Sequence, residues 1–365
     1  MLIKFAVSNY RGFQERIELD LSSPNGYSYN TFAIQGGIVK DLMIYGPNGS
    51  GKSNLGFAIF DIINHLTTKN KKTFPPSTYS FAGSDQPVVF EYTFMFDGET
   101  LRYEYSKNLL GVLLSEKVTL GTTVLLDRQS EHIHIDESLV VLQQSAKDNL
   151  LQQANNVSII SYLLNVFPMP KEHPLVRLDE FVNKMLWFRC LEGRGYLGFE
   201  VGTTNLESYI IENGLLFDFA SFVKEVSGQN YVFAKPLKGE KSISCIIDGH
   251  RIPLSSIEST GTASLKLLYY WLSKLSEASF VFIDEFDAFY HYELAFGVCK
   301  RLFSKDCQVM LTTHNTSLMT NDLLRPDCYY LIDGKQIKPL NKCTPKELRL
   351  GHNLEKLYRG NGFTI

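Results

Sequence analysis

The sequence has no long apolar segment, no cysteine pair and little net charge. No run approaches about 18 consecutive apolar residues, so no membrane-spanning helix is expected. The six cysteines are scattered without a Cys-x-x-Cys pair, which argues against a zinc ribbon or a disulfide framework and favours a reducing cytoplasm. A net charge of −3 argues against a general binder of polyanions. The opening residues turn polar at Ser8, so they do not resemble a signal peptide.

The remaining composition is that of a globular protein and predicts an α/β fold. Hydrophobic residues make up 44% and charged residues 21% of 365 positions, enough chain for two or three domains or one elaborated domain. Strand-like runs that alternate with helix-like runs indicate a largely parallel sheet, to which early hairpins add an antiparallel portion. Strands are predicted at 2–7, 16–21, 41–45, 88–96, 101–106, 280–283, 308–313 and 328–332, and helices at 57–66, 262–275 and 292–303.

Turn signals and changes of pattern suggest how the chain is divided. Asp97-Gly98 and Asp248-Gly249 each separate two strand-like runs and predict tight hairpins. Strand-rich sequence occupies residues 1–150, a mostly helical pattern follows in 151–240, and strands alternate with helices again in 241–365. We therefore expect a helical insertion between two parts of one α/β core.

A glycine-rich loop provides the first functional motif. The run GPNGSGKS matches the phosphate-loop pattern G-x-x-x-x-G-K-[ST], with an apolar strand before it and a helix after it. Glycines let successive backbone N–H groups point at phosphate oxygens, Lys52 would reach the β- and γ-phosphates, and the Ser53 hydroxyl would bind Mg²⁺. A chance glycine loop is the alternative, which the flanking elements disfavour. The predicted nucleotide-binding residues are Gly46, Pro47, Asn48, Gly49, Ser50, Gly51, Lys52, Ser53 and Asn54.

A pair of carboxylates ends the apolar run FVFI. Asp284 stands where a Walker B aspartate holds Mg²⁺, and Glu285 could act as the general base that activates the attacking water. A strand that ends in solvated acids is the alternative. His314 ends the neighbouring run VMLTTH and could sense the γ-phosphate, although a lone histidine is more often structural. More than half of the chain separates Lys52 from Asp284, which favours an insertion within one ATPase core.

The order of these motifs resembles a known class of ATPase. GPNGSGKS, ESTGTAS, FVFIDEFD and LTTHN follow one another as in the ABC-type ATPase heads of SMC, RecF and OLD-like proteins. The opening FAVSNYRGF and the segment DEFDAFYHYEL are similar to the first strand and to the Walker B and D-loop region of such heads. RPDCYYLIDG and HNLEKLYRGNGF resemble the ends of small AAA-labelled ATP-binding proteins, many of them encoded in bacterial antiphage defence operons.

The resemblance implies a fold, a cofactor and an assembly. An ABC-type head combines a mixed sheet, with an antiparallel N-terminal portion, and a parallel core, so residues 1–150 and 241–365 would form its two lobes around a short helical insertion, 151–240. Two such heads meet head to tail and sandwich two ATP molecules with Mg²⁺, which implies a homodimer or a higher homo-oligomer.

The resemblance also implies roles for residues outside the phosphate loop. Ser259 and Gly261 fit the relaxed S-x-G signature that faces the ATP of the partner subunit, and Thr262 stands where a second glycine is usual. Arg11 would lie near the nucleotide, with a surface turn as the alternative. The glutamine of the Q-loop is left open among several candidates: Gln86, Gln143, Gln144, Gln152 and Gln153.

Three functions remain open at this point. The first is an ATPase that controls a separate effector, a nuclease or a toxin, because the chain shows no nuclease centre of its own. The second is a DNA-binding ATPase of the RecF or SMC kind in DNA repair or recombination, and the third is a scaffold that hydrolyses ATP slowly. Cations near the C-terminus and at 69–72 could contact a nucleic-acid backbone or an acidic partner. Those near the C-terminus are Lys335, Lys338, Lys342, Lys346, Arg349, Lys356 and Arg359.

Overall fold

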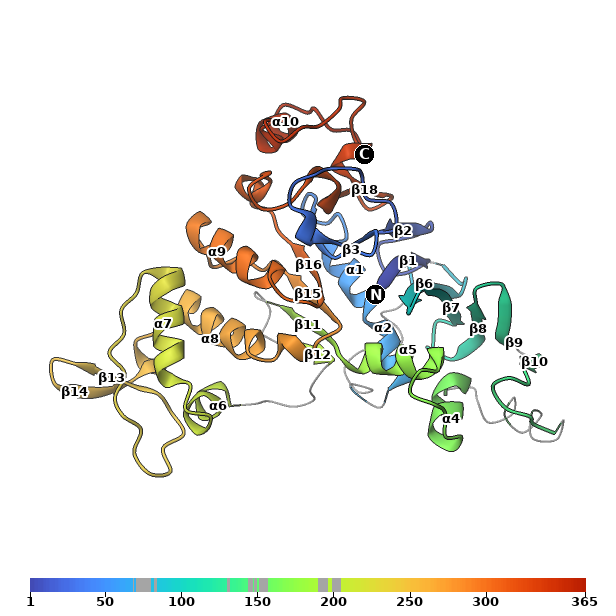
Figure 1. Cartoon of the computed structure of the whole chain (residues 1–365), viewed down its shortest axis with the longest axis horizontal. Helices are drawn as coiled ribbons and strands as arrows, with labels where there is room; N and C mark the ends of the chain where they lie inside the picture. Colours follow the sequence, from blue (N-terminus) through green and yellow to red (C-terminus); the bar gives the residue numbers. More distant parts are fainter. Residues whose placement is uncertain are drawn as a thin grey trace.

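Two seven-stranded sheets organise the computed structural model (Figure 1). It describes residues 1–67, 69, 80–81, 84–129, 132–143, 147, 150, 157–189, 196–198 and 205–365. One sheet is antiparallel and the other has a parallel centre, which confirms the predicted mixed α/β fold. Within the described residues, no helix has both the length and the apolar character needed to cross a bilayer.

The antiparallel sheet has the strand order β10-β9-β8-β7-β6-β1-β2. Its predicted hairpin turns at Asp97 and Gly98, whose φ angles of 50° and 87° are those of a type I′ turn. One face carries a row of buried aromatic side chains, including Phe90, Tyr92 and Phe94. Its strands are β1 (Leu2–Ser8), β2 (Ile17–Asp20), β6 (Val88–Phe96), β7 (Glu99–Lys107), β8 (Leu113–Leu120), β9 (Thr123–Gln129) and β10 (His132–Ile135).

The core sheet has the order β12-β11-β15-β16-β5-β17-β18. Its five central strands run parallel, and β12 and β18 pair antiparallel at its edges. All residues of β5, β15 and β16 are buried, as expected for strands covered on both faces. The strands are β5 (Asp41–Tyr45), β11 (Met185–Arg189), β12 (Tyr196–Gly198), β15 (Phe280–Asp284), β16 (Gln308–Thr312), β17 (Tyr329–Ile332) and β18 (Ile337–Pro339).

Strand β11 is the main difference from the sequence prediction. It pairs in parallel with β15, so residues 151–240, expected as a helical insertion, also supply a strand to the core sheet. The run MLWFR is short and begins with four apolar residues, and periodicity alone does not separate such a run from part of a buried helix. The helices of this segment are α4 (Ile159–Val166), α5 (Pro174–Asn183), α6 (Leu206–Glu212) and α7 (Leu216–Ser227).

Helices α1 (Lys52–Ile59) and α2 (Asp61–Leu66) lie between the two sheets. A Cβ added to Gly56 of α1 would lie 2.7 Å from the ring of Phe282 in β15, so α1 sits directly on the core sheet. On the other side, the Tyr92 hydroxyl of β6 donates to the carbonyls of Ala58 and Ile59, at 3.0 and 3.2 Å. The predicted helix 57–66 is thus interrupted between α1 and α2, and both sheets fix the position of the helix that follows the phosphate loop.

The other face of the core sheet carries α8 (Thr260–Leu272) and α9 (Tyr292–Phe303), with α7 packed on both of them (Figure 1). Helix α6, α7 and the hairpin β13 (Ser244–Ile247) and β14 (His250–Pro253) form a projection at the left of that view. The hairpin turns at Asp248-Gly249, as predicted.

The C-terminal residues form a second projection, at the top of Figure 1, which ends in α10 (Leu354–Arg359). A two-stranded sheet of β3 (Ile34–Gln35) and β4 (Ile38–Val39) precedes the core strand β5. Short 3-10 helices span Thr31–Ala33, Leu254–Ser256, Leu275–Glu277, Thr316–Leu318, Pro326–Cys328 and Leu340–Lys342.

Candidate nucleotide site

The phosphate loop lies at the carboxyl end of β5 and leads into α1. Gly46 has no space for a side chain, since a Cβ there would lie 2.4 Å from the backbone oxygen of Ile332. Gly51 has a φ of 97°, and a Cβ there would lie 2.5 Å from the ring of Phe13. The loop is therefore held between β17 and the turn that follows β1, in a backbone shape that requires glycine.

Lys52 is the first residue of α1 and is almost fully buried. Its ammonium donates to the carbonyl oxygens of Gly46 and Pro47, at 2.9 and 3.2 Å, so it stays inside the loop that would hold the phosphates. Burial lowers the pKa of Lys52, while the nearby carboxylates of Glu285 and Asp284 act in the opposite direction. The arrangement holds a cation beside two acids at the start of a helix, where anions bind favourably.

A cavity of about 190 Å³ brings three separate parts of the sequence together. Residues from the phosphate loop and the first turn of α1 form one wall, and Glu285 and His314 form another. These two residues follow β15 and β16, which are neighbours in the core sheet. The lining consists of Asn48, Gly49, Gly51, Lys52, Ser53, Asn54, Glu285 and His314.

Thr312 connects the two acidic residues at the end of β15. Its hydroxyl donates to Oδ1 of Asp284 at 2.7 Å and accepts the backbone N–H of Glu285 at 2.8 Å. Thr312 is fully buried and Asp284 nearly so. Glu285 has a φ of 49°, a left-handed conformation that is uncommon for a residue with a side chain and is concentrated at functional sites. The backbone turn thus directs the Glu285 side chain into the cavity, with Thr312 bonded to both sides of the turn.

His314 lies across the cavity from the loop and close to Glu285. Its Nε2 is 3.9 Å from Oε1 of Glu285. Burial lowers the pKa of His314 below its ordinary value, and the positive charge of Lys52 acts in the same direction. The preceding residue, Thr313, donates to Asp287 at 2.7 Å and anchors the segment. At neutral pH an uncharged imidazole therefore lines the same cavity as the loop.

The donor set suits Mg²⁺ better than a transition metal. Among the described residues, no group of three or more His, Cys, Asp and Glu side chains could hold a metal ion. Mg²⁺ commonly binds to one or two protein oxygens together with nucleotide phosphates and water. Ser53 lines the cavity and Asp284 precedes Glu285, so a hydroxyl and a carboxylate are available at the site.

The predicted signature residues lie outside this cavity, at the beginning of α8. Ser259 caps the helix, and its hydroxyl accepts the N–H of Thr262 at 3.1 Å. A Cβ added to Gly261 would lie 3.3 Å from the carbonyl oxygen of Phe289, so a larger residue there would press on the segment after β15. The Thr262 hydroxyl donates to Gln229 at 2.8 Å, which ties the start of α8 to the segment after α7.

Arg11 is placed near the phosphate-loop helix but does not line the cavity. Its guanidinium lies 4.0 Å from the ring centroid of Phe57 in α1, and its backbone has a φ of 49°. Gln86 and Gln143, two candidates for the Q-loop, also lie outside the cavity lining, and Gln144, Gln152 and Gln153 lie outside the described residues.

Sequence reasoning did not assign a role to Thr312 or Phe13. Thr312 ends β16 beside Asp284 at the end of β15, and this position could have indicated its hydrogen bonds. The contact of Phe13 with Gly51 has no sequence signal, because it joins segments that only the fold brings together.

The phosphate loop, the acidic pair after β15 and the mixed sheet define a P-loop nucleotide-binding protein. The family model described as "AAA domain, putative AbiEii toxin, Type IV TA system" matches residues 42–320, and the chain belongs to this family. No curated protein matches the chain.

Several solved structures are similar to this chain at low identity. An SMC head domain from Thermotoga maritima is 17% identical, with a TM-score of 0.40 over 93% of this chain and 98% of that one. An SMC head bound to the C-winged helix domain of ScpA is 16% identical, with a TM-score of 0.47 over 93% and 97% of the two chains. A structure of the recombination mediator RecF with ATP is 14% identical, with a TM-score of 0.40 over 93% and 99%.

Proposed function

We propose that this protein hydrolyses ATP with Mg²⁺, pairs head to tail around the nucleotide and controls a separate effector in bacterial antiphage defence. The observation that carries the proposal is the cavity in which Lys52, Glu285 and His314 meet. Its volume of about 190 Å³ is below that of most small-molecule sites, about 300–1,000 Å³, so one chain encloses only part of a nucleotide. A second chain would complete the site.

Each residue at the cavity has a role that its position supports. The phosphate-loop N–H groups and Lys52 bind and orient the phosphates, and Ser53 and Asp284 would hold Mg²⁺, which supplies charge neutralisation for phosphoryl transfer. Glu285 takes the proton of the attacking water, and the neutral His314 beside it can donate a hydrogen bond to the γ-phosphate. The left-handed backbone at Glu285 points this carboxylate to the required side.

The start of α8 is the surface that would complete the site of a partner subunit. Helix geometry leaves the N–H groups of Thr260 and Gly261 without acceptors inside the helix, and the Ser259 hydroxyl lies beside them. Such a helix N-terminus favours an anion. Ser259, Gly261 and Thr262 are outside the cavity of their own chain, as a role toward another chain requires.

ATP-driven pairing is the direct test of this proposal. Glu285→Gln should bind ATP and slow its hydrolysis, so multi-angle light scattering with ATP and Mg²⁺ should show a stable dimer or higher oligomer. Adding Ser259→Arg places a bulky cation at the proposed interface and should abolish pairing while ATP binding by the single chain persists. A Glu285→Gln protein that stays monomeric at saturating ATP would contradict the proposal.

The separate effector is inferred from the sequence, in which we find no nuclease centre, and from its resemblance to ATP-binding proteins of defence operons. Co-expression with the product of the neighbouring gene tests this part separately. We expect a complex whose stability or activity changes between ATP and ADP, and a neighbouring protein that neither binds nor changes its activity would contradict it. In a slow scaffold, Lys52→Ala would disrupt assembly without removing measurable hydrolysis, so steady-state turnover separates that alternative.

A DNA-binding ATPase remains the second candidate, and the C-terminal projection favours it. Residues 335–359 run from the edge of the core sheet into this projection and contain Lys335, Lys338, Lys346 and other cations, whereas Arg349 and Arg359 pair with Glu347 and Glu355. This function predicts that duplex DNA stimulates ATP turnover and that Lys-to-Gln changes in the projection remove the stimulation. Turnover that is indifferent to DNA would exclude it.

A further inference from the structure

A second concave surface lies far along the chain from the phosphate loop, beside α7. It has a volume of about 730 Å³ and is bounded by one face of α7, by the end of α6 and by residues 230–236. Phe217, Ala220, Ser221 and Lys224 follow one another at helical spacing along that face. We call this surface the α7 groove, and we propose that it binds an acidic amphipathic segment of a second, different protein.

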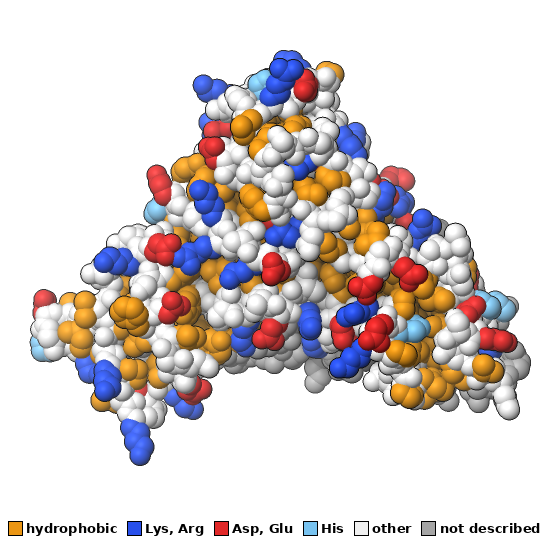
Figure 2. Space-filling model, viewed as in Figure 1, with side chains coloured by type: hydrophobic (Ala, Val, Ile, Leu, Met, Phe, Trp, Pro, Cys, Tyr) orange, Lys and Arg blue, Asp and Glu red, His pale blue; other side chains and the backbone are white. Residues whose placement is uncertain are grey.

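The α7 groove is lined by large apolar side chains that are exposed to solvent. The side chain of Phe217, in α7, is 85% exposed, and that of Val232, in the segment 230–236, is 59% exposed. Between them, the small residues Ala220 and Ser221 leave room for an inserted side chain. Figure 2 shows hydrophobic side chains gathered over the projection that contains α7. Concave apolar surfaces that are rimmed by polar groups are typical of protein interaction sites.

The charges around the groove identify the partner as acidic. The charged residues that line it are Lys224 and Lys235, both exposed cations. Three nearby acidic side chains interact elsewhere: Glu225 pairs with Arg301, Asp218 accepts the Tyr269 hydroxyl, and Glu240 pairs with Arg251. A fourth, Glu212, is exposed at the end of α6 but does not line the groove. A segment with carboxylates beside its apolar residues would therefore meet two cations and no lining acid.

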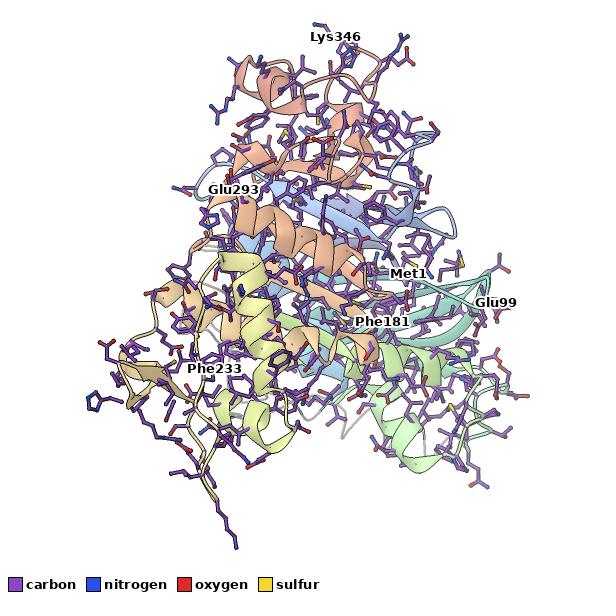
Figure 3. The ribbon with its side chains drawn as sticks, turned by 60° about the vertical axis from the view of Figure 1, so that its left-hand side comes forward. Met1, Glu99, Phe181, Phe233, Glu293 and Lys346 are labelled. Carbon is purple, nitrogen blue, oxygen red and sulfur yellow. The ribbon has the colours of Figure 1, made fainter. Side chains whose placement is uncertain are left out.

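The arrangement of the aromatic rings favours a protein over a single-stranded nucleic acid. Phe233 stacks on Phe219 with ring centroids 5.7 Å apart and on Tyr231 at 5.8 Å, and both pairs are nearly parallel. Figure 3 shows Phe233 beside α7. The three rings stack on one another, whereas nucleic-acid bases need open ring faces on which to stack. Phe217 offers such a face, but a site for single-stranded nucleic acid needs more than one open ring and two lysines.

The groove is also connected to the proposed ATP interface. Gln229 accepts a hydrogen bond from the Thr262 hydroxyl at 2.8 Å, and the Tyr231 hydroxyl lies 3.4 Å from the same atom. Residues 230–236, which form one wall of the groove, follow Gln229 directly. A partner that moves this wall would move the start of α8, so occupancy of the groove would alter ATP-driven pairing. This connection, unlike the docking itself, rests on the proposed function.

Phage display tests whether the α7 groove binds such a segment, and it does not require that the partner be known. Random 12-residue peptides are selected with the full chain as bait. We expect enriched peptides that combine large apolar residues with Asp or Glu. A fluorescein-labelled copy of the most enriched peptide should bind the wild-type chain in an anisotropy titration. Phe217→Ser together with Lys224→Glu and Lys235→Glu should weaken this binding by about tenfold or more.

The controls separate a specific loss from misfolding. Leu110→Ser with Lys238→Glu changes an exposed apolar residue and a lysine that do not line the groove, and it should leave peptide affinity unchanged. The groove variant should keep the thermal midpoint of the wild-type chain, because all three changed side chains are exposed.

The other possible outcomes of these experiments would each overturn the proposal. An absence of enriched peptides, a preference for basic peptides, or enriched peptides that bind the groove variant equally well would remove it. Tighter binding of a labelled oligonucleotide, lost in the groove variant, would assign the surface to nucleic acid. Self-association without nucleotide that Phe217→Ser abolishes would assign it to a second copy of this chain.

The connection to the ATP interface has its own measurement. In the Glu285→Gln background, saturating peptide should change the ATP concentration at half-maximal pairing by about fivefold or more, within the usual range of allosteric coupling. Gln229→Ala removes the acceptor of the Thr262 hydroxyl at a residue that does not line the groove, so this variant should bind the peptide normally and lose this change. Peptide binding that leaves pairing unaltered would refute the connection alone, and failure of Glu285→Gln to pair at all would refute the proposed function while the docking result stands.

Discussion

Thr312→Val tests whether one buried hydroxyl organises the acidic pair of the nucleotide site. Valine keeps the shape of threonine but can neither donate to Asp284 nor accept the N–H of Glu285, bonds of 2.7 and 2.8 Å in a fully buried position. A hydrogen bond to a charged group contributes about 1.5–3 kcal/mol, and a buried N–H left without an acceptor costs about 1–3 kcal/mol. We therefore expect a loss of roughly 3 kcal/mol in unfolding free energy.

The catalytic effect should exceed the effect on binding. Without its N–H bond, the left-handed turn at Glu285 loses a restraint. If Glu285 is the general base, as proposed, a displacement approaching 1 Å would cost about 100-fold in rate. The affinity for ATP should change little, because Thr312 does not line the cavity. Urea unfolding, steady-state ATPase assays and titration with a fluorescent ATP analogue measure the three quantities.

Thr312→Ser is the matched control, since it keeps the hydroxyl and removes only a methyl group. It should retain most of the activity and lose about 1 kcal/mol of stability. Thr312→Val with wild-type turnover and an unchanged urea midpoint would refute the reasoning. An equal loss of activity in both variants would show that the methyl packing, rather than the hydroxyl, positions Glu285.

Three further predictions concern the loop, a buried acid and the histidine. Gly46→Ala should weaken ATP binding at least about tenfold, measured with the same fluorescent analogue, because its Cβ would lie 2.4 Å from the Ile332 carbonyl oxygen. Burial raises the pKa of Asp41 to about 8, so the folded state holds a proton that the unfolded state loses near pH 4. Stability should therefore fall as pH rises from about 4 to 8, and Asp41→Asn should remove this slope in urea titrations. Because the pKa of His314 is lowered, a rate that needs its neutral form should be half-maximal at a pH below the ordinary histidine value of about 6.5, and His314→Gln should lose that acid limb in a pH–rate profile.

Each of these predictions has a result that would count against it. Gly297→Ala in α9 is the control for Gly46→Ala, because nothing lies within 4 Å of its added Cβ, and it should bind ATP normally. An Asp41→Asn protein with the same pH slope as the wild-type protein would assign the slope to another group. An acid limb that persists in His314→Gln would point instead to a carboxylate.

The elements that the sequence predicted best are those whose signals are local. Asp97-Gly98 and Asp248-Gly249 supply the positive φ angles that two-residue hairpins need, and both turns form as predicted. The buried strands at 41–45, 280–284 and 308–312 each have an apolar centre and are followed by turn or functional residues, so the sequence predicted their type and placed their ends within one residue.

The sequence did not predict the strand at 185–189 or the break at Phe60, because neither has a local signal. MLWFR is equally compatible with a buried helix, and it becomes a strand because it pairs with β15. The apolar spacing continues across Phe60, whereas the chain turns there to place α1 and α2 between two sheets. In both places, tertiary contacts decided between alternatives of similar local stability.

The sequence by itself determined the parts of the candidate nucleotide site: a glycine-rich loop, a lysine and a serine at the start of a helix, and acids and a histidine at the ends of apolar strands. The tertiary structure alone decided how these parts are arranged. Strands β5, β15 and β16 lie side by side, so their carboxyl ends bring Lys52, Glu285 and His314 to one cavity. It also decided that α8 begins outside that cavity and that the α7 groove is open, because distant contacts such as Thr312 with Asp284 and Gln229 with Thr262 leave no local pattern along the chain.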